Sequence, residues 1–291
     1  MLANVVLGIL GLMAVWFCLV WLKGLKKEES VAPTPHLFTV GFVTNFFDTL
    51  GIGSFAPTTA WFKGAGLVKD RIIPGTLNVG HTLPVIVMSF IFIQRVEVEP
   101  LTLALMLAAA VIGAYLGADI VSGLPERKVQ LGMGIALLIT AGFMLLGRLD
   151  LMPAGGDAIG LSGTRLIIAV VANFFLGALM TLGIGLYAPC MALIYALGMS
   201  PIVAFPIMMG SCAYLMPTAS VKFVKNGALN TKAAVGLALG GIPAVFIAAY
   251  LVTGLPMNVL TWLVIAVILY TAVTMLRSGM KPSVEAEPVG K

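Results

Sequence analysis

Two copies of one segment decide the fold: Thr49-Leu-Gly-Ile-Gly-Ser-Phe-Ala-Pro57 in the first half of the chain and Thr181-Leu-Gly-Ile-Gly-Leu-Tyr-Ala-Pro189 in the second. Equivalent residue numbers differ by 132 (49 and 181, 57 and 189), and Asn45-Phe-Phe recurs upstream as Asn173-Phe-Phe. Agreement of this length indicates an internal duplication.

Each copy lies inside an apolar stretch, and the whole chain is apolar. Of its 291 residues 60% are hydrophobic and 10% are charged, against about 25% charged in soluble domains. Most apolar segments are close to the roughly 20 residues of a membrane-spanning helix. They cover residues 1–22, 37–62, 72–93, 100–121, 129–147, 166–197, 202–221, 233–252 and 258–276. The composition predicts a polytopic membrane protein and argues against a soluble all-helical protein.

The first apolar segment is predicted to be retained as a membrane span. It has no basic residue before its apolar run, and its lysines follow it at Lys23, Lys26 and Lys27. A cleaved signal peptide has the opposite charge order. The net charge of +5 comes from basic residues that flank apolar segments, so we expect no nucleic-acid partner.

The two segments that carry the motif, 37–62 and 166–197, are each either one kinked span or a re-entrant hairpin. With two hairpins, 14 Lys and Arg residues lie on the inner side and 3 on the outer side, whereas single spans give 12 and 5. Positive residues favour the cytoplasmic side. The count therefore favours hairpins, with the N-terminus outside and the C-terminus inside.

We expect an all-α polytopic membrane protein with two inverted-topology repeats, preceded by one extra N-terminal span. Each repeat is predicted to hold one broken re-entrant helical hairpin and three transmembrane helices, which is typical of secondary transporters. The expected divisions are an N-terminal helix at 1–22, a cytoplasmic linker at 23–36, repeat 1 at 37–147, an outer linker at 148–165, repeat 2 at 166–276 and a cytoplasmic tail at 277–291.

The motif residues suit the tip of a broken helix. Glycines at 51, 53, 183 and 185 permit unusual backbone angles, and Pro57 and Pro189 suit the first turn of a returning helix. Ser54 is expected to cap that helix. Two helix N-termini would then meet near the midplane, where free N–H groups attract an anion. The alternative is that both breaks only allow close helix packing.

Polar residues near the tips complete the candidate site. Asp48 and His81 are ionisable groups inside apolar segments, which are functional candidates by default. We interpret both as candidates for proton coupling; alternatively they bond each other or Asn78 and stabilise the bundle. Asn45 and Asn173 either line the cavity or hold hairpin backbone together. The predicted substrate-binding residues are Thr49, Gly51, Gly53, Ser54, Phe55, Pro57, Asn78, His81, Thr181, Gly183, Gly185, Tyr187, Pro189 and Ser211.

No catalytic set, metal site or cofactor is predicted. The chain has no His-Glu-x-x-His, no Gly-x-Ser-x-Gly and no Walker A sequence. Its cysteines, Cys18, Cys190 and Cys212, lie in apolar segments without metal-ligand spacing and are interpreted as packing residues.

A duplicated Gly-x-Gly-x-x-x-Pro hairpin followed by a polar span resembles the TauE/SafE family of permeases, also called the toluene sulfonate uptake family. The resemblance covers about residues 37–276, with Ser54-Phe55 and Leu186-Tyr187 in place of the family's denser glycine run. It implies transport of sulfur-containing or organic anions, such as sulfite or a sulfonate.

The leading hypothesis is therefore a secondary transporter for a small anion that works by alternating access. An anion channel or uncoupled facilitator is the alternative, and a membrane enzyme is a weaker one. The expected partners are the anion and the lipid bilayer of a bacterial cytoplasmic (inner) membrane. A homodimer is a further alternative that the sequence leaves open.

Overall fold

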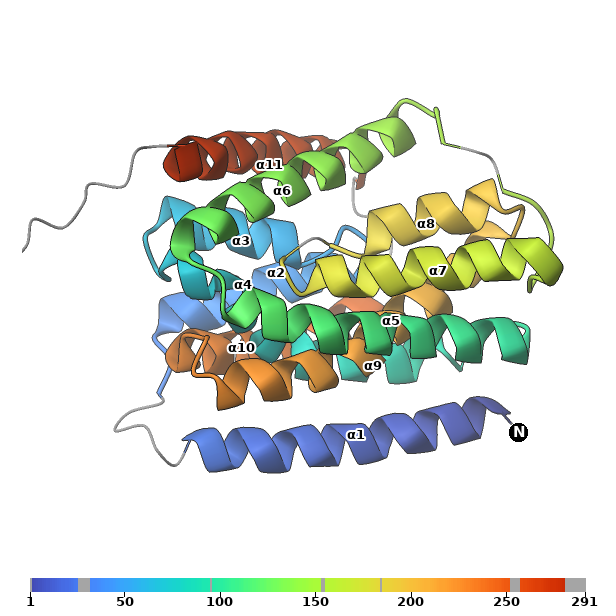
Figure 1. Cartoon of the computed structure of the whole chain (residues 1–291), viewed down its shortest axis with the longest axis horizontal. Helices are drawn as coiled ribbons and strands as arrows, with labels where there is room; N and C mark the ends of the chain where they lie inside the picture. The colour runs from blue at the N-terminus through green and yellow to red at the C-terminus, as the bar shows by residue number, and fades with distance from the viewer. Residues whose placement is uncertain are drawn as a thin grey trace, which may run out of the picture.

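The computed structural model describes residues 2–25, 32–94, 96–152, 155–183, 185–251 and 257–280, and every regular element in these residues is a helix (Figure 1). Part of the predicted linker at 23–36 and most of the predicted tail at 277–291 lie outside the described residues.

The first half holds α1 (Leu2–Leu25), α2 (Pro35–Thr49), α3 (Phe55–Gly64), η1 (Asp70–Ile72), α4 (Ile73–Phe92), α5 (Pro100–Ser122) and α6 (Glu126–Arg148). The second half holds α7 (Gly163–Met180), α8 (Tyr187–Ala196), η2 (Pro201–Val203), α9 (Ala204–Lys225), α10 (Thr231–Leu251) and α11 (Met257–Met280).

Seven helical stretches among the described residues are long and apolar enough to cross a membrane. They are Val5–Leu25, Asp70–Phe92, Pro100–Ser122, Glu126–Arg148, Gly163–Met180, Pro201–Lys225 and Thr231–Tyr250. These seven apolar helices support the prediction of an integral membrane protein. Helix α7 is one of them: with 18 residues it is long enough to span the membrane, although the sequence predicts it as one arm of a hairpin.

The chain reverses at both copies of the motif. His36, near the start of α2, accepts a hydrogen bond from the indole N–H of Trp61, near the end of α3 (3.0 Å). Arg165, near the start of α7, donates to the carbonyl of Leu197 just after α8 (3.5 Å). The returning helix of each pair therefore ends beside the start of the first helix.

The helices of the two halves exchange partners in a regular way. Helix α2 packs on α10 while its counterpart α7 packs on α5, and α4 packs on α10 while α9 packs on α5. Glycines allow the closest of these contacts: Gly240 lies against the Phe38 carbonyl, and Gly113 lies against the Phe174 carbonyl. Small residues at such crossings let two backbones approach.

Helices α4 and α9 form the centre of the bundle and run antiparallel. Ser89 donates to the Met209 carbonyl (2.8 Å), and Thr82 contacts Ser220 (3.0 Å), so residue numbers rise along one helix as they fall along the other. Helices α6 and α11 also run antiparallel, since Arg127 reaches the Gly279 carbonyl and Gly134 meets Leu276. Each of these pairs joins equivalent helices of the two halves.

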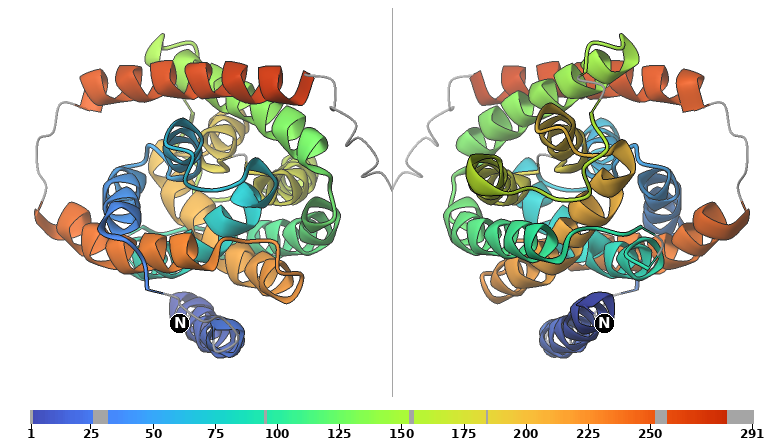
Figure 2. Two further views of the ribbon diagram at one scale, coloured as in Figure 1. Left: turned by 90° about the vertical axis from the view of Figure 1, so that its left-hand side faces the viewer. Right: turned by 90° about the vertical axis from the view of Figure 1, so that its right-hand side faces the viewer.

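Helix α1 lies outside this arrangement, along one side of the bundle (Figures 1 and 2). It packs on α9 and α4 through buried residues such as Leu10 and Phe17, and the Tyr214 hydroxyl donates to the Val6 carbonyl. Its other face exposes large apolar side chains such as Leu12, as expected of a lipid-facing helix.

Candidate functional site

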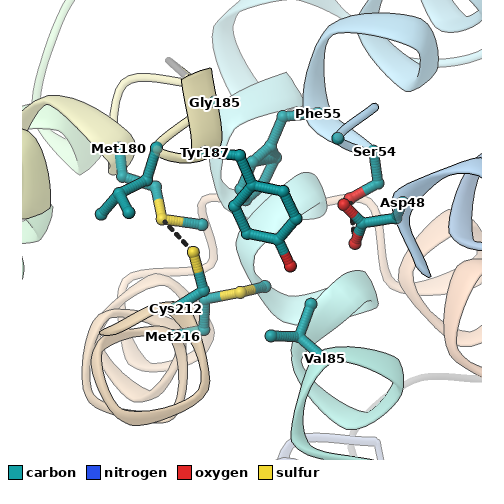
Figure 3. Close-up of a pocket in the computed structure, with 11 residues that line it drawn as sticks. Asp48, Ser54, Phe55, Val85, Met180, Gly185, Tyr187, Cys212 and Met216 are labelled. Atoms are coloured by element: carbon teal, nitrogen blue, oxygen red, sulfur yellow. Dashed lines mark hydrogen bonds between the residues drawn. The ribbon is translucent and has the colours of Figure 1, made fainter. Parts of the chain in front are cut away.

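One small cavity lies between the two motif segments (Figure 3). Its volume of ≈ 20 Å³ gives room for a water molecule and is too small for a polyatomic anion. It is lined by Asp48, Gly53, Ser54, Phe55, Val85, Met180, Gly185, Leu186, Tyr187, Cys212 and Met216. The cavity therefore has walls from both halves of the chain.

The first tip is built by backbone that only glycine adopts easily. Gly51 and Gly53 have φ angles of 92° and 91°, a region that side chains with a Cβ disfavour. The amide of Gly51 bonds the Asp48 carbonyl (2.9 Å), and the amide of Ile52 bonds the Phe47 carbonyl (3.1 Å). These bonds close α2 and turn the chain into α3.

Ser54 does not cap α3 in the way the sequence predicts. Its backbone is helical (φ −91°, ψ −32°), and its side chain makes no capping hydrogen bond. A capping residue needs an extended backbone to aim its oxygen at the first amides. Instead the Ser54 hydroxyl donates to the Asp48 carboxylate (3.0 Å), so the residue ties the tip to the end of α2.

Asp48 is a buried carboxyl group on the wall of the cavity. It is 2% exposed, and its side chain accepts a hydrogen bond from Ser54, which is neither of the predicted partners His81 and Asn78. The ion pairs found in the described part of the chain, Lys63–Asp70 and Lys222–Asp119, do not include it. A buried carboxylate without a cation costs several kcal/mol, so binding a proton or a cation here is favoured.

The second tip presents aromatic and sulfur groups where the first presents a carboxyl group. Gly183 has a φ of 102°, and Tyr187 starts α8 with its hydroxyl 3.6 Å from the Met88 sulfur. Met180, the repeat counterpart of Asp48, lies with its sulfur 3.5 Å from that of Cys212. Figure 3 shows Met180 and Cys212 on the opposite side of the Tyr187 ring from Asp48. The two halves of the cavity therefore differ chemically.

His81 lies behind the cavity wall. Its Nδ1 is 3.0 Å from the Asn45 side-chain oxygen and its Nε2 is 3.0 Å from the Thr58 hydroxyl. The oxygen of Asn45 only accepts, so Nδ1 carries the proton and Nε2 accepts from Thr58. The ring also meets Phe55 edge to face at 5.7 Å. His81 thus joins α4 to both arms of the first hairpin and does not line the cavity.

The other asparagine pair is also structural in its contacts. Asn45 donates to the Gly41 carbonyl (2.7 Å). Asn173 donates to the Met106 carbonyl (2.8 Å) and to Ser211 (3.0 Å). The Asn45 bond to Gly41 lies within α2, and the Asn173 bonds join α7 to α5 and α9. Neither asparagine lines the cavity between the tips, and both roles that the sequence suggests for them stay predictions.

The cavity collects six of the residues singled out in the sequence: Asp48, Gly53, Ser54, Phe55, Gly185 and Tyr187. Gly51 lines a neighbouring cavity, and Pro189 lines an apolar groove between α6, α7 and α8. The remaining predicted residues line none of these cavities and are Thr49, Pro57, Asn78, His81, Thr181, Gly183 and Ser211.

Sequence reasoning did not select Val85, Leu186 or Met216, which complete the wall. Met180 and Cys212 line the cavity as well. Met180 is the repeat counterpart of Asp48, and Cys212 is both a predicted packing residue and one of the polar residues in the span that follows the second hairpin. Apolar residues in an apolar helix carry no chemical signal, so only the packing of α4 and α9 against the tips identifies them.

Comparisons with protein-family models, with curated proteins and with solved structures find no match to this chain. Within the described residues there is also no group of three or more His, Cys, Asp or Glu side chains that could hold a metal ion.

Proposed function

We propose that the chain is a secondary transporter for a small anion, with the substrate bound between the two tips. The observation that carries the proposal is the shared cavity. Equivalent motif residues of the two halves, Gly53 with Gly185 and Phe55 with Tyr187, line the same small space. A motif that served only close helix packing would not need to place both copies at one cavity.

The proposed architecture is two inverted repeats whose hairpins enter the membrane from opposite faces. The antiparallel crossings of α4 with α9 and of α6 with α11 support it, because equivalent helices that run in opposite directions belong to halves of opposite orientation. The exchange of partners between α2, α5, α7 and α10 supports it as well. Such repeats allow a central site to open to either side in turn.

An anion is the proposed substrate because two helix N-termini meet at the cavity, while no positively charged side chain is among its described lining residues. Helices α3 and α8 both begin at this cavity, at Phe55 and Tyr187. The first N–H groups of a helix have no partner within it and carry a partial positive charge. Asp48, beside the same cavity, is the proposed proton-coupling residue.

The volume of ≈ 20 Å³ corresponds to an occluded conformation in this proposal. Substrate binding then requires the tips to separate, as alternating access demands. Membership of the TauE/SafE family is part of the proposal and rests on the motif. Sulfite and short sulfonates are therefore the first substrates to test, in a protein of the bacterial cytoplasmic membrane.

The test is anion uptake into proteoliposomes that contain the purified protein. We expect saturable uptake by the wild type. Gly53→Leu or Gly185→Leu should abolish it, because each side chain would fill the cavity. Gly66→Leu is the matched control for Gly53, because its φ of 62° is also positive, and Gly64→Leu is the control for Gly185. A Cβ at either control position also meets nothing within 4 Å, and neither residue lines a cavity described here. Normal uptake by both tip variants would overturn the tip site.

Electrical recording separates the transporter from the channel alternative. A transporter saturates and responds to the coupling gradient, whereas a channel passes a current that follows the anion gradient alone. Channel-like currents without any response to a proton gradient would replace the proposal with an anion channel.

A further inference from the structure

A second and larger cavity adjoins the tips on the side of Arg148. Its volume is ≈ 230 Å³, and it is lined by Leu50, Gly51, Ile52, Phe143, Met144, Gly147, Arg148, Met152, Ala188 and Met191. We call it the vestibule. It has room for several waters or a small anion, in contrast to the tip cavity at ≈ 20 Å³.

A third space of ≈ 20 Å³ shares lining residues with both the vestibule and the tip cavity. Ile52 and Ala188 line both the vestibule and this middle space. The middle space in turn shares Gly53, Phe55, Gly185 and Tyr187 with the tip cavity. The three cavities therefore form a row from Arg148 to Asp48.

Phe55 and Tyr187 line both of the small cavities in the row. They occupy the same position in the two copies of the motif, and both are buried, at 3% and 6% exposure. Each ring borders both small cavities, so the pair forms the partition between them. His81 supports the Phe55 ring from behind at 5.7 Å.

Arg148 is the charged residue among the described residues that line the vestibule, whose other walls are mostly apolar. It ends α6 and is half-buried. Ala188, in the first turn of the ten-residue helix α8, faces the same space, so the partial positive charge of that helix N-terminus adds to the guanidinium. A cavity with low-dielectric walls and one sign of charge raises the local concentration of the opposite ion.

We propose that the vestibule is a peripheral anion-binding site, in which Arg148 captures the anion before it passes the Phe55–Tyr187 partition to the tips. This inference rests on the proposed function for the passage of the anion. The binding site itself is testable without transport.

The test measures the charge preference of the vestibule with a thiol introduced by Gly147→Cys. A Cβ at Gly147 meets nothing closer than the Met152 side chain at 3.7 Å, so the substitution fits. Cys18→Ser removes the partly exposed native thiol, while Cys190 and Cys212 are buried. The introduced thiol is labelled with an anionic sulfonatoethyl or a cationic trimethylammonium-ethyl methanethiosulfonate, and the two rates are compared.

We expect the ratio of anionic to cationic labelling rates to fall about tenfold when Arg148→Gln is added. An effect on the reactivity of the thiol itself changes both rates alike and cancels in the ratio. Arg165→Gln is the matched control, because it removes one positive charge from a residue that lines none of the three cavities. An unchanged ratio with Arg148→Gln, or an equal fall with Arg165→Gln, would overturn the vestibule site.

The partition is tested with the native thiol of Cys212, which lies beyond it in the tip cavity. Phe55→Ala should open the partition and speed labelling of Cys212 several-fold, read by mass spectrometry. Phe62→Ala is the control, since it removes the same ring from a buried position of α3 outside the cavities. Equal rates of Cys212 labelling in the two variants would show that Phe55 does not separate the vestibule from the tip cavity.

Transport then connects the site to function. Arg148→Gln should raise the KM for the anion several-fold with an unchanged maximal rate, and Arg148→Lys should restore most of the affinity. If the wild type transports no anion, the proposed function fails while the labelling result stands. If it transports and Arg148→Gln leaves KM unchanged, the capture role fails alone.

Discussion

Asp48 is where the two halves of the site differ most, since its counterpart is Met180. Asp48→Asn keeps an oxygen that accepts the Ser54 hydrogen bond but removes the group that binds a proton. We expect the variant to exchange anion across the vesicle membrane at equal pH and to lose acceleration by an imposed pH gradient. Uptake assays with and without the gradient measure both properties.

Ser54→Ala is the control for Asp48. It removes the 3.0 Å hydrogen bond and keeps the carboxyl group, so the response to the pH gradient should survive. A gradient response in Asp48→Asn as large as in the wild type would show that protons are coupled elsewhere.

At the residue scale, the motif itself predicts the part of the cavity that the repeats supply. Gly53, Phe55, Gly185 and Tyr187 belong to the duplicated segment, and all four line one cavity. Val85 could not be predicted, because its place depends on which face of α4 meets the tips. Packing against α9 and α10 determines that face, and a uniformly apolar sequence does not show which face of a helix will make these contacts.

At the element scale, His81 fastens the first hairpin to α4. His81→Leu leaves the buried Asn45 oxygen and the Thr58 hydroxyl without their partner, and each unpaired buried group costs about 1–3 kcal/mol. We expect a loss of stability of about 2–4 kcal/mol, measured by thermal unfolding in detergent. His36→Leu should change stability by less than about 0.5 kcal/mol, because its bond to Trp61 is exposed. Equal losses in both variants would contradict this role.

Glu99 provides a pH-dependent cap for α5. Its carboxylate accepts hydrogen bonds from the amides of Leu101 (3.0 Å) and Thr102 (2.6 Å). A hydrogen bond with the Thr102 side chain and the two bonds from these amides lower the pKa of Glu99. The folded state therefore binds the proton less readily than the unfolded state. The stabilisation is complete above the ordinary carboxyl pKa of about 4.3 and is lost as pH falls through the lower folded pKa.

Glu99→Ala should accordingly lower the free energy of unfolding by about 1 kcal/mol at neutral pH. The difference from the wild type should shrink as the pH falls below about 4. Glu97→Ala, at an exposed neighbouring position, should show neither effect. Melting curves across this pH range measure it, and a difference that grows on acidification would have the wrong sign.

The ends of the elements near the motif follow from glycine and proline. Helix α2 ends at Thr49 and α3 begins at Phe55, on either side of Gly51 and Gly53 as the backbone argument predicts. The length of α7 could not be inferred in the same way. The apolar segment predicts a start at residue 166, whereas the helix begins at Gly163. Ser162 stands at its N-cap with extended backbone (φ −140°, ψ 164°), a start signal that the pattern of apolar residues does not include.

At the scale of the whole molecule, the duplication predicts equivalent elements but not their partners. The contact of α2 with α10 joins a helix near the start of the chain to one near its end. It depends on Gly236 and Gly240 meeting the α2 backbone. Glycine spacing in the sequence shows that a close crossing is possible without naming the helix that makes it.

The proposed opposite orientation of the two halves makes a prediction about sidedness. Gly64, at the base of the first hairpin, and Ser162, just before the second, are both exposed and tolerate a small side chain. In a Cys18→Ser background, we expect Gly64→Cys to react with an impermeant thiol reagent from the inner side of the membrane. Ser162→Cys should react from the outer side.

Intact cells and inverted vesicles present the two sides separately, so each variant serves as the control for the other. The charge count places the basic residues near Gly64 inside and Arg148 and Arg165 outside. Labelling of both thiols from one side would leave the hairpins entering from the same face, and inverted repeats could not then form the site. If Gly64→Cys instead reacts from the outer side and Ser162→Cys from the inner side, the halves still have opposite orientations, but the whole molecule has the reverse orientation in the membrane.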